Sequence, residues 1–319
     1  MTGLNRTDGG DGTRPAAKTI HRGFGAPLRS LLGRDWTLAW LFLAPATLIV
    51  LGLIAYPAVS AFLLSFQSRF LGQVVGQWVG LRNYAKLLGK GSLYLSAAWM
   101  TVKYTAIAVG AKFVLGLLGA SILNQTFRGR NFWRGILFIP WAVPGAVAAY
   151  AWRFVYDPAG FFNTLILLTG IREEYIYFLA DERLAFWSVM VVAIWSGAPF
   201  YMMNFLAGMQ SIPAELYEAA EIDGAGVLQR FWHVTLAGLR PVILIVLLVS
   251  IIGTSGQLNP IYILTAGGPN NATLTLPMFS YRQAFSSRLL GYGAAISVTM
   301  MPFYMLLVIV LTRWMLRQD

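Results

Sequence analysis

Six apolar stretches, each about 20 residues long, limit the architectures that this chain can adopt. A helix of about that length crosses the hydrocarbon core of a bilayer. Because hydrocarbon offers the backbone no hydrogen-bond partners, each stretch is expected to be helical. Charged residues make up 12% of the chain, about half the share usual in a soluble protein. The sequence therefore predicts an all-α integral membrane protein with six transmembrane helices, near Ala39–Phe62, Thr101–Leu123, Ile136–Tyr156, Ala185–Ala207, Val242–Leu264 and Tyr292–Trp314.

The distribution of basic residues indicates how these helices are oriented. Thirteen Lys and Arg residues lie before the first stretch, in the second and fourth connections, and after the last stretch, against eight in the other connections. Such an excess marks the cytoplasmic side, so both termini are predicted to be cytoplasmic. This bias also accounts for the net charge of +11, so we expect membrane lipid and no nucleic acid as a partner.

The domain organisation follows from the same pattern. Residues 1–35 are predicted to form a flexible basic cytoplasmic tail, and residues 36–319 a single membrane domain. The first apolar stretch is too long for the core of a cleavable signal, which favours an uncleaved anchor. No internal repeat is visible.

A polar segment at about 211–241 separates the fourth and fifth stretches. Ser211 is predicted to cap a short helix that has Pro213 in its first turn. Asp223-Gly224 should end this helix, since glycine readily adopts the left-handed conformation. A second helix is expected from Ala225 to Leu236.

The first of these short helices carries both charged and small side chains. Three glutamates recur every three residues and share roughly one face: Glu215, Glu218 and Glu221. Small residues lie among them, so the backbone of another protein could approach closely at Ala219, Ala220 and Gly224.

Prolines interrupt the third stretch at Pro140 and Pro144, and Gly145 follows. They should loosen or kink the helix, either as a hinge or as a packed kink.

Three cations fall within the apolar stretches: Lys103, Lys112 and Arg153. Lys103 and Arg153 lie toward helix ends, where a long side chain can reach the interface. Lys112 is more central and is expected either to line a cavity or to pair within the bundle. No carboxylate lies in any stretch, which argues against a carrier driven by protons or sodium ions.

The fifth stretch carries a polar face of Ser250, Thr254 and Gln257, at positions i, i+4 and i+7 of a helix. Hydroxyl and amide groups both donate and accept hydrogen bonds, as sugar hydroxyls require. The same residues could instead form hydrogen bonds between helices. The face is therefore interpreted as a solute pathway or as interhelical contacts.

No catalytic set is visible in the sequence. The chain has no cysteine, and its two histidines, His21 and His233, lie in the tail and in the polar segment. The glycine spacing around Gly89-Lys90 does not fit a phosphate-binding loop. We therefore expect no enzyme activity of its own, no metal site and no cofactor bound by this chain, and a membrane-embedded enzyme is disfavoured.

Several of these motifs resemble one family. Glu218-Ala219-Ala220, followed by Gly224 and Pro241, resembles the EAA loop of permease subunits of binding-protein-dependent ABC importers. Val234 and Ala237 depart from the usual exit of that loop. Further matches follow the family's order along the chain: Gly80-Leu81 with Asn83-Tyr84, Arg128-Gly129, Pro140 with Pro144, Asp157-Pro158, and Gly267-Gly268-Pro269. The chain is similar to the carbohydrate-type, maltose-permease-like group, which has the six-helix type I importer permease (MetI-like) fold.

The resemblance implies a function and a set of partners. The chain would be one of two permease subunits in a bacterial or archaeal cytoplasmic membrane, the second being identical or a relative. Two ATP-binding cassette ATPase subunits would use ATP and Mg, and an extracytoplasmic solute-binding protein would deliver a sugar. The complex would import it by ATP-driven alternating access. The residues implied in coupling to the ATPase are Glu215, Glu218, Ala219, Ala220, Asp223 and Gly224.

By the same resemblance, Trp141, Gly145 and Gly197 would border a sugar pocket formed with Ser250, Thr254 and Gln257. Ala193 stands where the maltose-type pocket offers an amide, which argues against maltose as the solute. A polyol or a glycerol-phosphate-type solute is an alternative. Phosphate favours clustered cations, and Lys112 is the one cation expected near the pathway, so a neutral solute is predicted. An ATP-independent secondary carrier is the alternative from another class.

Overall fold

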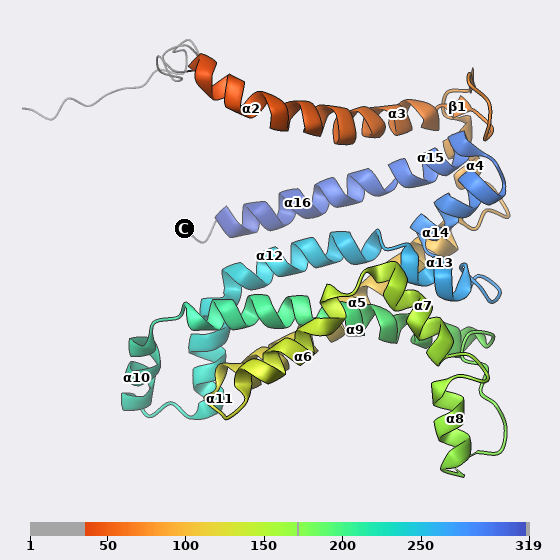
Figure 1. The fold of residues 1–319 in the computed structure, drawn as a ribbon. Coiled ribbons are helices and arrows are strands. Elements are labelled where there is room, and N and C mark those ends of the chain that lie inside the picture. The colour runs from red at the N-terminus through yellow and green to blue at the C-terminus, as the bar shows by residue number, and fades with distance from the viewer. Residues whose placement is uncertain (1–35, 171, 317–319) are drawn as a thin grey trace, which may run out of the picture. The chain divides into compact units, whose positions relative to one another are not determined.

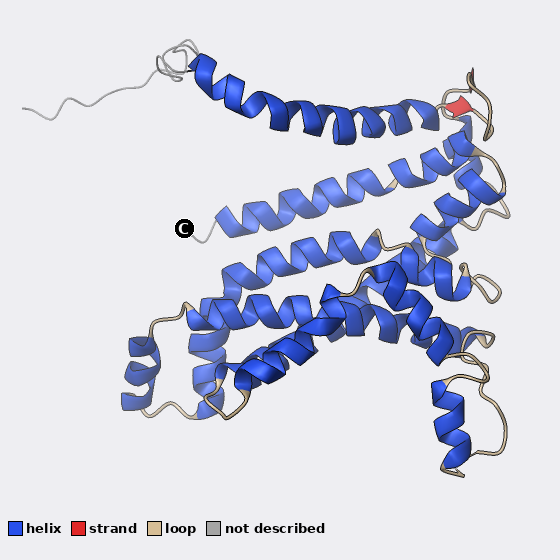
Figure 2. Cartoon of the chain, viewed as in Figure 1, coloured by secondary structure: helices blue, strands red, loops and turns tan. Residues whose placement is uncertain are grey.

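The computed structural model describes residues 36–170 and 172–316 (Figure 1). The tail predicted over residues 1–35 lies outside this part of the chain. Helices make up most of the described residues, with one short two-stranded ladder between them (Figure 2). Five of the described helices are long and apolar enough to cross a membrane, and one bent pair brings the number to six. The prediction of an all-α protein with six spans is confirmed.

Contacts divide the chain into two compact units, one ending at Pro57 and the next beginning at Ala58. In the first unit, α2 (Trp36–Val50) passes into a π-helical turn, η1 (Leu51–Ala55). The helix continues directly into α3 (Tyr56–Ser65), whose last residues belong to the second unit. Together these elements form the first predicted span.

A hairpin follows the first span, and its strands are β1 (Gln67–Ser68) and β2 (Gln77–Trp78). They pair antiparallel, with Gln67 opposite Trp78. The short helix α4 (Arg82–Leu87) comes next. Asn83 Nδ2 donates hydrogen bonds to the carbonyls of Ser65 and Gln67 at 2.8 and 2.9 Å. The Asn83 side chain thus satisfies a carbonyl that the end of α3 leaves without a helical partner.

The two longest helices pack against each other in the second unit: α5 (Tyr94–Asn124) and α9 (Glu182–Gln210). Small residues allow this close approach. A Cβ atom added at Gly116 of α5 would collide with the Tyr201 side chain of α9 and lie 3.1 Å from the Met202 amide nitrogen. The same addition at Gly119 would bring it 2.5 Å from Met202 Sδ.

The third span is broken, as its prolines predict. Helix α6 (Arg130–Ala142) and helix α7 (Gly145–Val155) meet at an angle of 95°. Pro144, which has no amide hydrogen, occupies the N-cap of α7. Val143 takes an extended conformation (ψ 127°) and ends α6. The kink is a sharp break rather than a gentle bend.

The fifth span begins before its predicted range, Val242–Leu264, and ends within one residue of it, since the apolar helical stretch covers Val227–Thr265. The helix begins as α11 (Val227–Arg230), passes through a π turn, η2 (Phe231–Thr235), and continues as α12 (Leu236–Ser255). Helix α13 (Asn259–Thr265) is separate. Pro260 lies in the first turn of α13, where its missing amide hydrogen is not needed.

The remaining helices complete the second unit: α8 (Phe161–Leu168), α10 (Ala214–Ile222), α14 (Leu276–Tyr281), the π turn η3 (Arg282–Ser286), α15 (Leu290–Val298) and α16 (Met300–Leu316). The last span is formed by α15 and α16, which together are long and apolar enough to cross a membrane over Leu290–Trp314.

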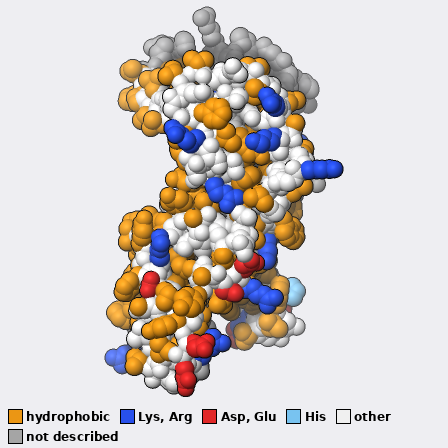
Figure 3. All heavy atoms as spheres, turned by 90° about the vertical axis from the view of Figure 1, so that its right-hand side faces the viewer, with side chains coloured by type: hydrophobic (Ala, Val, Ile, Leu, Met, Phe, Trp, Pro, Cys, Tyr) orange, Lys and Arg blue, Asp and Glu red, His pale blue; other side chains and the backbone are white. Residues whose placement is uncertain are grey.

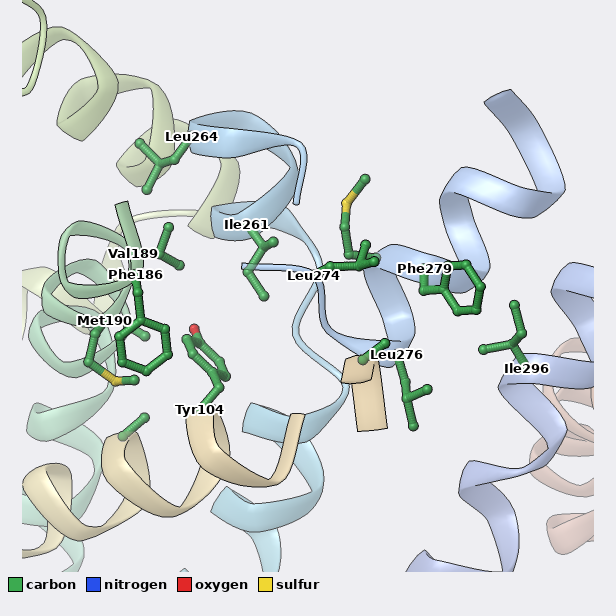
Figure 4. Close-up of a cluster of buried hydrophobic side chains, with 14 of the residues drawn as sticks. Tyr104, Phe186, Val189, Met190, Ile261, Leu264, Leu274, Leu276, Phe279 and Ile296 are labelled. Atoms are coloured by element: carbon green, nitrogen blue, oxygen red, sulfur yellow. The ribbon is translucent and has the colours of Figure 1, made fainter. Parts of the chain in front are cut away.

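The larger buried cluster lies where α5 and α9 meet the segments after α12 (Figure 4). Tyr104 of α5 lies beside Phe186 and Met190 of α9 in this view. Ile261 of α13 and Leu276 of α14 extend the cluster toward α15. The long helices are therefore fixed to one another at the end of the bundle where α13 and α14 lie.

Many large apolar side chains remain exposed, among them Leu118, Ile122, Tyr150, Phe154 and Leu306. Figure 3 views the end that carries α4 and α8, where Lys and Arg side chains are spread among hydrophobic ones. Exposed apolar surface of this extent is typical of a protein that faces lipid or other subunits rather than water.

Candidate functional site

The polar segment forms a helix, a break and a second helix, as predicted. Helix α10 ends at Ile222, and Gly224 follows with a left-handed φ of +78°. Nothing lies within 4 Å of the position that a Cβ atom at Gly224 would occupy. The turn therefore requires glycine for its backbone conformation and not for internal space.

Three details of this segment differ from the prediction. Ser211 does not cap α10, because its hydroxyl donates to the Gly208 carbonyl at 2.8 Å and closes the end of α9 instead. Pro213 occupies the N-cap of α10 rather than its first turn. The second helix begins at Val227 rather than Ala225, and it does not end at Leu236 but runs on into α12.

Helix α10 contacts the helical segment that leads into α12 at two points, one in α11 and one in η2. Arg230 donates to Glu221 Oε2 at 2.8 Å, and the Tyr217 and Thr235 hydroxyls lie 3.0 Å apart. Glu221 is thereby engaged within the chain, although the sequence placed it with the other two glutamates. Glu215 and Glu218 are exposed, so their carboxylates are accessible to a partner.

A hollow of about 290 Å³ lies between α10 and α11. Three of the six predicted coupling residues line it: Ala220, Asp223 and Gly224. His233 lines it as well, and its Nδ1 atom lies 3.0 Å from the Gln229 carbonyl. The small residues leave this hollow open to a side chain from outside.

A second pocket, of about 320 Å³, lies among α5, α6, α9 and α12. Five of the six residues predicted for the solute pathway line it: Trp141, Gly197, Ser250, Thr254 and Gln257. Four of them come from α6, α9 and α12, and Gln257 lies in the connection after α12. Gly145, the sixth, does not line this pocket, because it begins α7 on the other side of the 95° break from Trp141.

Gln257 makes an interhelical contact, which is one of the two alternatives that the sequence left open. Its Oε1 atom accepts a hydrogen bond from the Tyr104 hydroxyl at 3.0 Å, which joins the segment after α12 to α5. Its side-chain nitrogen, Nε2, has no hydrogen-bond partner among the described residues, and the residue lines the pocket. The role of this residue in a solute pathway stays a prediction.

Lys112 also lines this pocket, and it satisfies both of its own sequence alternatives. It is 5% exposed, and its Nζ atom donates to Thr254 Oγ1 at 2.9 Å. Sequence reasoning missed Ser196, Phe200, Val249 and Gly253 as lining residues. Phe200 and Gly253 could have been found by helical spacing, since each stands three residues after a predicted lining residue, Gly197 and Ser250. Val249 is next to Ser250 in the sequence, and that spacing gives no such signal.

The other two cations and Ala193 lie elsewhere. Lys103 is exposed, with its Nζ atom 4.5 Å from the centre of the Phe186 ring. Arg153 donates to the Ile263 carbonyl at 3.2 Å. Ala193 is fully buried in the core and does not line the pocket. The departure from the maltose-type pattern at this position therefore leaves the lining of this pocket unchanged.

Residues 112–318 match the model of the family described as binding-protein-dependent transport system inner membrane component. The chain belongs to this family. It is accordingly a transport subunit and an integral inner-membrane protein. Curated relatives include the trehalose/maltose transport system permease protein MalF of Thermococcus litoralis, 34% identical over 83% of this chain and 89% of the relative. The arabinooligosaccharides transport system permease protein AraP of Bacillus subtilis is 34% identical over 82% of this chain and 83% of its own length. The sn-glycerol-3-phosphate transport system permease protein UgpA of Salmonella typhimurium is 32% identical over 88% and 95%.

The fold is shared with a chain of a solved bacterial ABC transporter involved in the import of the acidic polysaccharide alginate. The TM-score is 0.77 at 20% identity, with 91% of this permease and 98% of that chain covered. This similarity confirms the type I importer permease fold.

Proposed function

We propose that this permease imports a carbohydrate across the cytoplasmic membrane by alternating access. The observation that carries the proposal is the pocket among α5, α6, α9 and α12, where an indole, hydroxyls and an unengaged amide donor converge within an apolar bundle. An aromatic face suits the apolar side of a sugar ring, and hydroxyl and amide groups suit its hydroxyls. The names of the relatives, which include trehalose, maltose and arabinooligosaccharides, support this solute class.

The chain works with four kinds of partner in this proposal: a second permease of similar fold, two ATP-binding cassette ATPase subunits, an extracytoplasmic solute-binding protein and the sugar. The relative structure solved with a periplasmic binding protein supports such an assembly. ATP and Mg are used by the ATPase subunits, and this chain binds no cofactor and has no catalytic site of its own. Both termini and the polar segment face the cytoplasm.

The polar segment docks on an ATPase subunit in this mechanism. Exposed Glu215 and Glu218 offer charge, and the hollow lined by Ala220, Asp223 and Gly224 accepts a side chain of the ATPase. Closure of the ATPase pair on ATP moves α10, and the bundle then exposes the pocket to the opposite side of the membrane.

Reconstitution tests the function. The permease pair, the ATPase subunits and the binding protein are placed in liposomes, and uptake of labelled mono- and disaccharides is measured. Uptake is expected with ATP inside and to stop when the ATPase or the binding protein is omitted. Accumulation without nucleotide would instead identify a secondary carrier, and uptake of no carbohydrate would refute the solute class.

Replacing Gln257 by Leu tests the pocket. Uptake is expected to fall by about tenfold, the equivalent of one hydrogen bond worth about 1.4 kcal/mol. Tyr104→Phe is the matched control, since it removes the same bond between α5 and α12 but leaves the amide in the pocket. If Tyr104→Phe lowers uptake as much as Gln257→Leu does, the role of Gln257 is confined to joining the helices.

A further inference from the structure

Lys112 occupies an unusual place for a cation. It lies in the interior of α5, within the apolar bundle, and it is 5% exposed. A cation within a membrane span costs about 2.5–3.5 kcal/mol on insertion scales, so such residues normally pair or serve a solute pathway. Thr254 is its hydrogen-bond partner, and a hydroxyl carries no charge.

No carboxylate among the described residues compensates this charge. The residues that line the pocket with Lys112 include no Asp or Glu. Within the described part of the chain, α5, α6 and α12 contain no acidic residue, and α9 has one, Glu182, at its first position. The ion pair between Arg230 and Glu221 lies in the polar segment, away from Lys112.

The surroundings of Lys112 hold its extended side chain at the pocket. Gly197 of α9 lies beside the stem, where an added Cβ atom would come within 2.5 Å of Lys112 Cε. Thr254 of α12 then accepts a hydrogen bond from the ammonium. Joining helices needs only neutral hydroxyls or amides, which are less costly to bury than a charge. The charge itself therefore needs another explanation.

We infer that Lys112 selects an anionic solute: the pocket binds a sugar or polyol derivative that carries one carboxylate, sulfonate or phosphate group, with its remaining hydroxyls on Ser250 and Gln257. This inference rests on the proposed function and narrows its solute class. It replaces the expectation of a neutral solute, which assumed that a single cation was insufficient to bind a phosphate group. In a site that excludes water, one cation attracts an anion far more strongly than it does on an exposed surface.

Direct binding tests the inference without the selectivity of the binding protein. The complex of both permeases and the ATPase subunits is purified in nanodiscs, and two matched pairs of probes are titrated by calorimetry. One pair is a glucose disaccharide and the same disaccharide with one unit oxidised to glucuronate. The other pair is glycerol and glycerol 3-phosphate. In at least one pair the anionic member is expected to bind about tenfold more tightly, a difference of about 1.4 kcal/mol.

Lys112→Met keeps an unbranched side chain that is one atom shorter and removes its charge, so it should abolish this preference. Gly197→Ala keeps the charge but displaces the ammonium, and it should weaken the preference by about half as much on a logarithmic scale. Lys103→Met is the matched control, because Lys103 lies on the same helix outside the pocket, and it should leave the preference unchanged. Gel filtration of each complex checks that its subunits remain assembled.

The outcomes separate the inference from the proposed function. Tighter binding of the neutral member in both pairs, or a preference unchanged by Lys112→Met, would overturn the inference and leave carbohydrate transport standing. If Lys112→Met instead releases the second permease, the lysine pairs with a carboxylate of that subunit, and the inference fails. Binding of no probe by the wild-type complex would count against the proposed solute class as well.

Discussion

Replacing Gly224 by Asp is expected to leave the permease assembled and to lower ATP-driven uptake by about tenfold or more. A residue other than glycine in the left-handed conformation costs about 1–2 kcal/mol, and φ at Gly224 is +78°. The added side chain would also point into open space on the proposed docking surface, beside the hollow that Asp223 and Gly224 line. Uptake and ATP hydrolysis measured in the same proteoliposomes check the result, and hydrolysis should persist while uptake falls.

Gly129→Asp is the matched control for this variant. Gly129 also has a left-handed φ, +84°, and open space around it, but it lies in the connection between α5 and α6. The two variants share the left-handed backbone and the added charge. They differ in their place on the surface and in the helix end beside them, since Gly129 is the N-cap of α6 and Gly224 follows the C-terminal end of α10. Normal uptake by Gly224→Asp, or an equal loss of uptake in Gly129→Asp, would show that the polar segment has no special role in coupling.

Gly116→Leu is expected to prevent the permease from folding. A Cβ atom at this position already collides with Tyr201 and lies 3.1 Å from the Met202 backbone nitrogen, so α5 and α9 would have to separate. Overpacking of a core costs about 1–3 kcal/mol, and more where the obstacle is backbone that cannot move away. The yield of monodisperse protein after detergent extraction, and its thermal unfolding midpoint, measure the loss.

Gly110→Leu provides the comparison on the same helix. Nothing lies within 4 Å of a Cβ atom at Gly110, and the residue is exposed. It should therefore express and unfold like the unaltered chain. A folded Gly116→Leu protein with an unchanged midpoint would show that the close packing of α5 on α9 is not needed for stability.

The sequence predicted the spans well because apolar length is a direct consequence of bilayer thickness. It also predicted the break near Pro144 and the turn at Gly224, since both depend on the backbone of a single residue. A helix was predicted from Ala225 to Leu236, but its continuation into the fifth span was missed, because the polar residues between Gln229 and Arg240 interrupt the apolar pattern. A helix outside the hydrocarbon region carries no apolar signal that would mark its end.

The site residues that the sequence predicted correctly are those whose positions depend on nearby residues in the chain. Ser250 and Thr254 stand one turn apart on α12, as predicted, and both line the pocket. Gln257 also lines it, although α12 ends at Ser255 and the residue lies in the connection that follows. The sequence could not decide whether Lys112 pairs within the bundle or lines a cavity. That depends on the distance between α5 and α12, which the spacing of residues within one helix does not reveal. Gly145 was misplaced because the direction of a helix after a broken turn depends on tertiary packing.

Helix α10 is joined through Glu221 and Tyr217 to a helical segment that runs without a loop from Val227 to Ser255. This segment changes direction between α11 and α12, where the π turn η2 lies (Figure 1). Its first residues include Arg230 and Thr235, which contact α10, and its last turns carry the hydroxyls of Ser250 and Thr254. The proposed docking surface and the pocket therefore lie at opposite ends of one continuous run of helical backbone, and we expect a displacement of α10 to reach the pocket through it.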